Sequence, residues 1–192
     1  MVAINLKLID LSTEEEKTRT VYKIICIVSA VVMIITATYG IVAGIIQGVD
    51  VVGETFVTVE FPPPEVFVFF YAKPVTWLAA SIIAFWFSFF ELQKNRILMI
   101  PKFIRQTGMF IAFFIAAMAF YEVLFNFTIW GALMAKEALG ELASWNPDIL
   151  QNPFPNPEVP WNLVFATKLF VVITIVAIYT FYFFQRIEST KS

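Results

Sequence analysis

Two ionisable side chains, Glu122 and Lys168, lie inside long apolar runs of the sequence. Asn126 follows Glu122 by four residues, and residues at this spacing share one face of a helix. We therefore expect the carboxylate and the amide to point in the same direction. Charged groups within a membrane are costly, and they are typical of ion paths, proton relays and buried ion pairs. Glu122, Asn126 and Lys168 are the candidate site of this chain.

Three interpretations of this polar cluster are open. Glu122 and Lys168 could line an ion path or proton relay. They could instead lock two helices together with Asn126, or Lys168 could extend its amine toward the aqueous phase. In the third interpretation, one of the charges pairs with a neighbouring subunit. A relay needs a chain of titratable sites, so one carboxylate and one amine favour helix locking or subunit docking.

The sequence contains no histidine and a single cysteine, Cys26. Haem, copper, zinc and non-haem iron sites depend on imidazole and thiolate ligands. We therefore expect no catalytic residue, no metal site and no cofactor in this chain, and any copper or haem would be held by partner subunits. The carboxylates of Asp50, Glu54, Glu60 and Glu65 have no spacing typical of a metal site, and we interpret them as a solvated face.

The elements that must position the polar cluster are membrane-spanning helices. Of the 192 residues, 59% are hydrophobic and only 15% are charged, whereas about a quarter of a soluble domain is charged. Four apolar runs have about the ~20 residues needed to cross ~30 Å of hydrocarbon. The predicted spans are residues 24–46, 74–90, 107–134 and 161–184. The predicted fold class is an all-α integral membrane protein, a four-transmembrane-helix bundle that forms a single domain over residues 1–192.

The distribution of basic residues predicts an orientation. Ten of the 13 Lys and Arg residues fall on one side of this topology, and two, Lys73 and Lys136, fall on the other. The positive-inside rule then predicts a multi-pass protein of the cell membrane with both termini in the cytoplasm, and this outcome requires an even number of spans. A net charge of −2 offers no basic face for nucleic acid. The expected partners are lipids and other integral-membrane subunits.

Two outer connections, residues 47–73 and 135–160, carry eight carboxylates against two bases and are rich in proline. Residues 55–61 alternate polar and apolar side chains, which predicts a strand. Residues 135–145 are predicted to extend the third span as a helix. Prolines at the density of residues 152–160 favour an extended, stiff segment. We expect these connections to form an ordered, acidic outer cap.

Small residues recur at four-residue spacing in three of the spans, and this pattern allows membrane helices to approach closely. The candidate helix-packing residues are Gly40, Gly44 and Gly48 in the first span, Ala80, Ala84 and Ser88 in the second, and Gly108, Ala112 and Ala116 in the third. The pattern is common, and it is compatible with packing inside the bundle and with contacts to helices of partner proteins.

Residues 121–130, with the sequence YEVLFNFTIW, are followed by the proline-rich connection. This stretch resembles small accessory membrane subunits of the archaeal ammonia monooxygenase complex, and the resemblance covers the second to fourth spans. It implies a helical subunit that packs beside copper-carrying subunits. Because this chain has no histidine, it lacks the usual copper ligands, and the resemblance assigns no catalytic residue to it.

Three classes of function are compatible with these observations. The favoured one is a non-catalytic accessory subunit of a multisubunit membrane complex, either a copper membrane monooxygenase or a respiratory complex. The second is a small homo-oligomeric transporter or channel in which Glu122 and Lys168 face a shared water-filled path. The third, a membrane enzyme or lipid-modifying protein, would need carboxylates and amides that converge at the membrane interface, and the sequence shows no such cluster.

Overall fold

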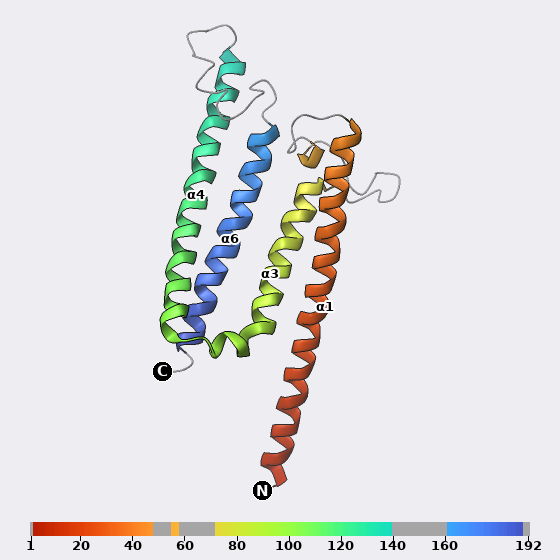
Figure 1. Ribbon diagram of the computed structural model, residues 1–192, viewed down its shortest axis with the longest axis vertical. Helices are drawn as coiled ribbons and strands as arrows, with labels where there is room; N and C mark the ends of the chain where they lie inside the picture. The colour runs from red at the N-terminus through yellow and green to blue at the C-terminus, as the bar shows by residue number, and fades with distance from the viewer. Residues whose placement is uncertain (1, 48–54, 58–71, 140–160, 190–192) are drawn as a thin grey trace.

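The computed structural model describes residues 2–47, 55–57, 72–139 and 161–189 of the chain. Four long helices account for most of these residues (Figure 1). They are α1 (Val2–Gln47), α3 (Pro74–Leu98), α4 (Lys102–Leu139) and α6 (Trp161–Ser189). Residues 55–57 add one short helical turn between α1 and α3.

Each long helix contains a segment that is long and apolar enough to cross a membrane. The four segments are Glu14–Ile46, Pro74–Leu98, Lys102–Leu133 and Leu163–Ser189. Within the described residues, the all-α prediction is confirmed, and the four helices have the length and apolar composition expected of a multi-pass membrane protein. Pro74 occupies the start of α3, where its missing N–H leaves no helical hydrogen bond unmade.

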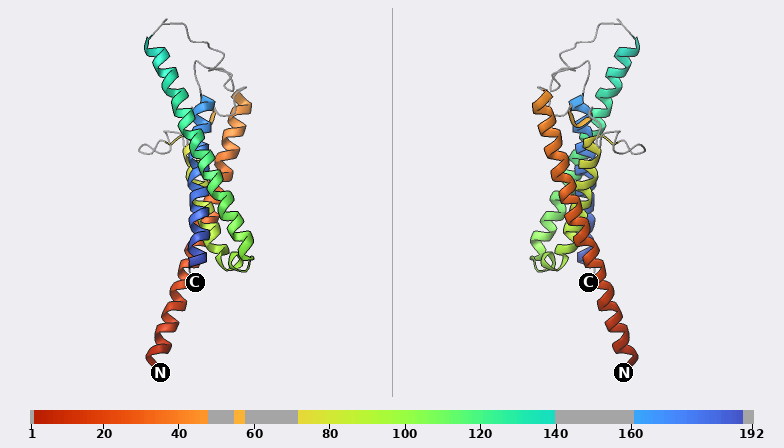
Figure 2. Two further views of the ribbon diagram at one scale, coloured as in Figure 1. Left: turned by 90° about the vertical axis from the view of Figure 1, so that its left-hand side faces the viewer. Right: turned by 90° about the vertical axis from the view of Figure 1, so that its right-hand side faces the viewer.

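The helices are longer than the apolar runs that revealed them. The 46 residues of α1 extend about 69 Å at ~1.5 Å per residue, which is more than twice the ~30 Å of bilayer hydrocarbon. The N-terminal part of α1 projects beyond the other helices, on the side where both chain termini lie (Figures 1 and 2). We call this side the terminal end of the molecule and the opposite side the far end.

The four helices stand in a row, in the order α4, α6, α3, α1 (Figure 1). Helix α6 packs along α4, α3 packs along α1, and contacts between α3 and α6 join the two pairs. The side views show that the row is thin, with α4 inclined to the other helices (Figure 2). The bundle is therefore an open layer, in which α4 and α1 form the two edges.

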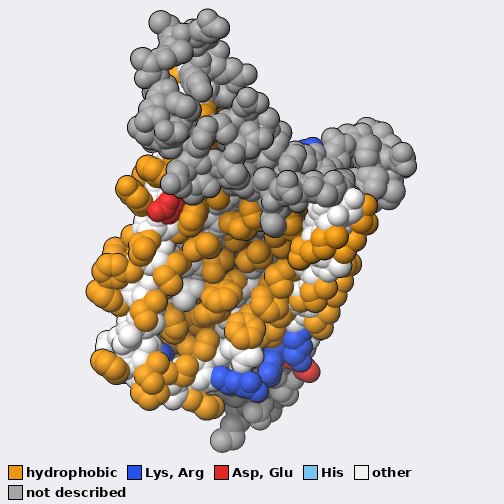
Figure 3. Space-filling model, turned by 45° about the horizontal axis from the view of Figure 1, so that its top comes forward, with side chains coloured by type: hydrophobic (Ala, Val, Ile, Leu, Met, Phe, Trp, Pro, Cys, Tyr) orange, Lys and Arg blue, Asp and Glu red, His pale blue; other side chains and the backbone are white. Residues whose placement is uncertain are grey.

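An open layer buries side chains only along its seams. No more than 28% of the apolar window of any span is buried, so most apolar side chains face outward (Figure 3). Two buried clusters join α3 to α6. The cluster at the terminal end contains Phe90, Tyr179, Phe183 and Ile187. The cluster at the far end contains Phe56 and Val57 of the short turn and Val75 of α3, with Val164 and Phe165 of α6 packed against them.

The strand prediction for residues 55–61 is wrong for its first three residues, which form a helical turn. The turn buries Phe56, which is 4% exposed, and the Phe56 ring lies 5.3 Å from that of Phe165 on α6. This tertiary packing outweighs the alternating pattern, because strand preference depends on the surface that a segment covers. Residues 58–61 lie outside the described residues. Helix α4 continues to Leu139, which confirms the helical extension for residues 135–139. Residues 48–54, 58–71 and 140–160 lie outside the described residues, and with them most of the predicted acidic cap.

Candidate functional site

The polar cluster belongs to the seam between α4 and α6. Every third or fourth residue of α4 is buried along this seam, the spacing at which one helix packs against another. The most buried members are Arg105, Ala112, Ala116, Ala119, Val123 and Asn126. Three of these residues, Ala112, Ala116 and Ala119, are alanines on successive turns, and their small side chains leave room for the backbones of α4 and α6 to approach closely. Asn126 is thus part of the helix contact.

Two contacts fix the register of this seam. Arg105 of α4 bonds Glu188 of α6, and the ring centroids of Phe113 and Phe181 lie 6.0 Å apart. Because the two helices run antiparallel, the register continues residue for residue. Asn126 lies 21 residues after Arg105, and Thr167 lies 21 residues before Glu188. Asn126 is therefore level with the turn of α6 that carries Thr167 and Lys168.

Asn126 is 4% exposed, and within the part of the chain that the structure describes its Nδ2 has no hydrogen-bond partner. The nearby hydroxyl of Thr167 donates to the carbonyl of Leu163 in its own helix, over 2.7 Å. A buried amide without a partner costs about 1–3 kcal/mol. The seam therefore holds a polar group with unused hydrogen-bonding capacity at the level of Lys168.

Glu122 and Lys168 are both half-buried, and the structure does not bring them together. Among the described residues, neither takes part in an ion pair. The charge of Lys168 lies within electrostatic range of Lys73, at the beginning of α3. The positions therefore do not support locking of α4 to α6 by a bond between Glu122 and Lys168.

The depth of Glu122 follows from its distance along α4. Glu122 lies 17 residues beyond Arg105, which is about 25 Å at ~1.5 Å per residue. The hydrocarbon core is ~30 Å thick. When its surface on the terminal side is placed at Arg105, Glu122 lies in the part of the core nearer the far end of the molecule. Asn126 and Lys168 then lie close to the far boundary.

The structure contains a set of ion pairs at the terminal end that were not predicted from the sequence. Arg105, which is 5% exposed, contacts Glu188 Oε1 through Nε at 2.9 Å and Nη2 at 2.7 Å. Its Nη1 donates to the carbonyls of Leu98 at 3.1 Å and Ile100 at 2.8 Å. Arg105 therefore closes the turn between α3 and α4 and ties it to α6.

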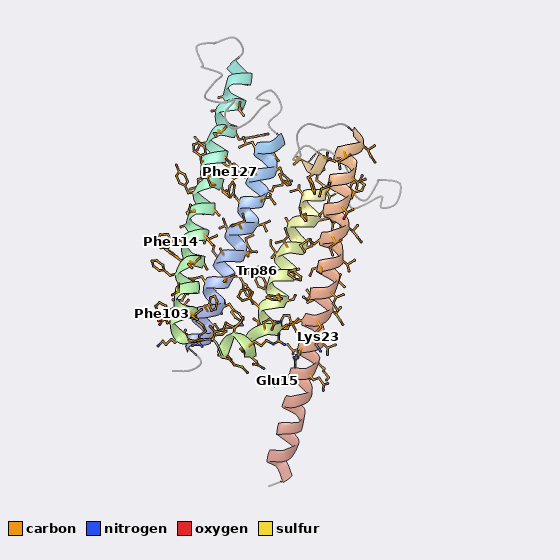
Figure 4. All side chains as sticks on the ribbon, in the orientation of Figure 1. Glu15, Lys23, Trp86, Phe103, Phe114 and Phe127 are labelled. Atoms are coloured by element: carbon orange, nitrogen blue, oxygen red, sulfur yellow. The ribbon has the colours of Figure 1, made fainter. Side chains whose placement is uncertain are left out.

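A second ion pair joins α6 to α3. Arg186 bonds the carboxylate of Glu91, and the hydroxyl of Tyr179 donates to the same oxygen over 3.1 Å. Deeper in the seam, Trp86 Nε1 donates to Thr180 Oγ1 over 2.8 Å, and Figure 4 shows Trp86 between the two helices. Together with the Arg105 pair, these bonds form the terminal clasp.

The sequence offered one signal for the terminal clasp. Glu91 and Glu188 are carboxylates at the ends of apolar runs, on the side of the topology where the bases gather. The surplus of Lys and Arg on that side predicts the orientation, but it does not predict the bonds of Arg105 and Arg186. A carboxylate in that position is expected to bond a neighbouring base across helices, because helix ends at the membrane surface are close together.

The small residues of α1 contact the short turn at the far end. A Cβ atom built on Gly40 would lie 2.3 Å from the Phe56 ring, and one on Gly44 would lie 3.2 Å from Thr55 Oγ1. Gly40 therefore gives Phe56 the room that it occupies. Gly48 lies outside the described residues.

The small residues of α3 and α4 lie in different surroundings. Ala80 and Ala84 line an open groove of about 360 Å³ between α3 and α1. Ser88 is 1% exposed and donates to the carbonyl of Ala84. A Cβ atom on Gly108 would lie 3.3 Å from the Phe184 ring, while Ala112 belongs to the α4–α6 seam. Ala116 lies one turn further along the same seam.

Within the described ranges, no three His, Cys, Asp or Glu side chains gather where they could hold a metal ion. Comparison of the chain with protein families, with curated proteins and with solved structures gives no match. The function must therefore be argued from the geometry of the chain itself.

Proposed function

We propose that the chain is a non-catalytic accessory subunit of a larger membrane complex, and that the α4 edge of the layer docks on a partner subunit. The observation that carries the proposal is the state of Glu122 and Lys168. Both lie in membrane-spanning segments, both are half-buried, and neither is in an ion pair among the described residues. Glu122 lies deeper in the membrane than Lys168, and intramembrane carboxylates normally pair, so a positive charge from a partner would complete the site.

The open layer supports the same proposal. Helix α4 exposes a series of large aromatic side chains, among them Phe114 and Phe127, which are labelled in Figure 4. Their exposed fractions are 49% and 62%. Aromatic side chains bury a large area for little loss of side-chain entropy, which is why they are enriched at protein interfaces. This edge offers an apolar surface and, close to it, the carboxylate of Glu122, which has no ion-pair partner in the described part of the chain.

The complex that we propose first is a copper membrane monooxygenase of the ammonia monooxygenase type, and a respiratory complex is the second choice. The resemblance that leads to it falls on residues 121–130, and this segment of α4 contains Glu122 and Asn126. In such a complex the copper would be bound by partner subunits, since this chain has no histidine. The chain would contribute structure and docking surface.

We further propose that the protein lies in the cell membrane with its terminal end in the cytoplasm. Both termini lie at that end of the layer (Figure 1). Lys94, Arg96, Lys102 and Arg105 lie at the same end, at the turn between α3 and α4. A concentration of Lys and Arg beside the spans is the usual mark of the cytoplasmic side.

Extraction of native membranes in a mild detergent, followed by a native gel and mass spectrometry, tests the proposal. The expected result is one band in which this chain migrates with larger, different membrane subunits. A band that contains only copies of this chain would contradict the proposal. The respiratory or monooxygenase assignment is then read from the identity of the co-migrating subunits.

The second candidate function is a homo-oligomeric transporter or channel. It is favoured by Asn126 Nδ2, which has no hydrogen-bond partner among the described residues and lies in the same part of α4 as Glu122 and level with Lys168. In this function, the three groups of several copies would line a shared water-filled path. Ion flux through vesicles that contain only this chain, abolished by Glu122→Gln with the oligomer intact, would establish it over the accessory function.

A further inference from the structure

The turn between α3 and α4 carries three exposed bases, Lys94, Arg96 and Lys102. The last turns of α3 bend away from the axis of that helix and run across the terminal end of the row toward α4 (Figure 1). The bases therefore lie where two spanning helices leave the membrane. Lys and Arg also gather along the lower edge of the face drawn in Figure 3.

These three bases differ from the arginines of the terminal clasp. Arg105 and Arg186 are engaged with Glu188 and Glu91. Lys94 and Arg96 take part in no ion pair within the part of the chain that the structure describes.

The positive charge of Lys102 is only weakly neutralised by Glu188. Its Nζ lies 4.0 Å from a Glu188 oxygen, and 69% of its side chain is exposed. Glu188 already bonds Arg105 at 2.7 Å. The turn therefore presents positive charge that the described residues do not neutralise.

Large apolar side chains are exposed between these bases and directly after them. Met99 is 82% exposed, Phe103 is 76% exposed and Ile104 is 55% exposed. In water, such exposure would be unfavourable. At the edge of a bilayer, apolar side chains enter the boundary of the acyl chains while neighbouring bases meet the headgroups. The alternation of the two kinds of side chain fits a lipid surface better than an aqueous one.

We propose that the α3–α4 turn binds the headgroups of anionic phospholipids. Lys94, Arg96 and Lys102 contact the phosphate groups, and Met99 and Phe103 enter the adjoining acyl layer. The argument for lipid as the occupant is the combination of unneutralised positive charge, exposed apolar groups and a position at the ends of two spans. The inference does not depend on whether the chain is a subunit of a complex.

The test uses the purified full chain in detergent and measures binding of phosphatidylglycerol and phosphatidylcholine by native mass spectrometry. Wild type is expected to prefer phosphatidylglycerol. Each base near an anionic surface contributes about a fivefold change in affinity, so Lys94→Gln/Arg96→Gln should reduce the preference at least about tenfold. Because neither side chain is in a described ion pair, the variant is expected to fold as wild type does.

A control of equal charge removes two exposed bases from the N-terminal part of α1, Arg19 and Lys17, of which Lys17 is in an exposed ion pair with Glu14 over 3.0 Å. Lys17→Gln/Arg19→Gln changes the net charge by the same amount and should keep most of the preference. Equal losses in the two variants would overturn the proposal, and so would an unchanged preference in Lys94→Gln/Arg96→Gln.

A soluble competitor separates lipid binding from binding of free phosphate. Glycerol phosphate at millimolar concentration should not displace phosphatidylglycerol, because it lacks the acyl chains that Met99 and Phe103 would contact. Displacement would overturn the assignment to lipid. An acidic peptide added in the same experiment tests whether the bases bind a protein instead. If the peptide displaced phosphatidylglycerol at micromolar concentration, the assignment to lipid would be overturned as well.

Discussion

Arg105 of α4 places both its Nε and its Nη2 within 2.9 Å of one carboxylate oxygen of Glu188 on α6. Two residues earlier on α6, Arg186 bonds Glu91 of α3. Helix α6 therefore uses one charge of each sign to hold its two neighbours. In an open layer without a central core, these bonds at the terminal end are expected to carry a large share of the stability.

Replacement of Arg105 by Gln should lower the free energy of unfolding by about 2–3 kcal/mol. The variant loses the bonds to Glu188 and to the two carbonyls of the α3–α4 turn, and it leaves a carboxylate that is 23% exposed. Unfolding by titration with a denaturing detergent, followed by circular dichroism, measures the change. The control is Arg96→Gln, at an exposed base, which should stay within about 0.5 kcal/mol of wild type. Equal stability of the two variants would refute the role of Arg105.

Tyr179→Phe isolates one hydrogen bond. The substitution removes the hydroxyl that donates to Glu91 and keeps the ring, whose centroid lies 3.6 Å from that of Phe87. We expect a loss of about 1 kcal/mol in the same unfolding measurement. Tyr182, which is 54% exposed, provides the matched control, and Tyr182→Phe should cost much less. If Tyr182→Phe cost as much, the bond to Glu91 would not be the cause.

Gly40→Ala tests the contact between α1 and the short turn. The added methyl group would overlap the ring of Phe56 at 2.3 Å, and the ring is buried and packed on Phe165. Overpacking of this kind costs about 1–3 kcal/mol. Gly131→Ala is the control, because a Cβ atom there meets nothing within 4 Å, and a helical alanine in place of glycine is neutral or stabilising.

A double variant separates steric overlap from other effects of Gly40→Ala. Phe56→Leu shortens the side chain that the new methyl group would meet. Gly40→Ala should therefore cost less in a Phe56→Leu background than in wild type, and the difference is the coupling energy of the pair. Equal costs in both backgrounds would show that Phe56 is not the obstacle.

The four spans could be predicted because apolar length is a local property of the sequence. Their true extent could not, because residues such as Lys17 and Arg19 have good helix propensity and continue α1 without any apolar signal. The order of the helices in the row was also beyond the sequence. It depends on contacts such as Arg105–Glu188 and Trp86–Thr180, which lie 83 and 94 residues apart.

For the polar cluster, too, the sequence predicted one property and could not predict others. The spacing of Glu122 and Asn126 placed both on one side of a helix, but it could not say which of them enters the seam. The rotation of α4 is set by the row of Ala112, Ala116 and Ala119, and this rotation buries Asn126 while it leaves Glu122 half-exposed. Whether Glu122 meets Lys168 depends on the register between α4 and α6, which the terminal clasp fixes.

Glu122→Gln should weaken assembly with partner subunits more than it weakens the fold. The carboxylate has no ion-pair partner among the described residues, so its neutralisation should change the free energy of unfolding by less than about 0.5 kcal/mol. Loss of an ion pair with a partner should cost about 2–5 kcal/mol of association free energy. A shift of the chain from the complex to the free fraction on a native gel measures the second effect. The docking role would be contradicted if Glu122→Gln destabilised the fold while the chains that remained folded were still fully assembled with their partners.

The central claim is that the chain works as one subunit among different subunits. The most direct measurement is the native mass of the particle that contains it, extracted from its own membrane in a polymer-bounded lipid disc without detergent. The proposal predicts a particle much heavier than the 21.9 kDa chain, with at least one different membrane protein in fixed ratio to it. A particle of one chain, or of whole multiples of 21.9 kDa alone, would contradict the claim.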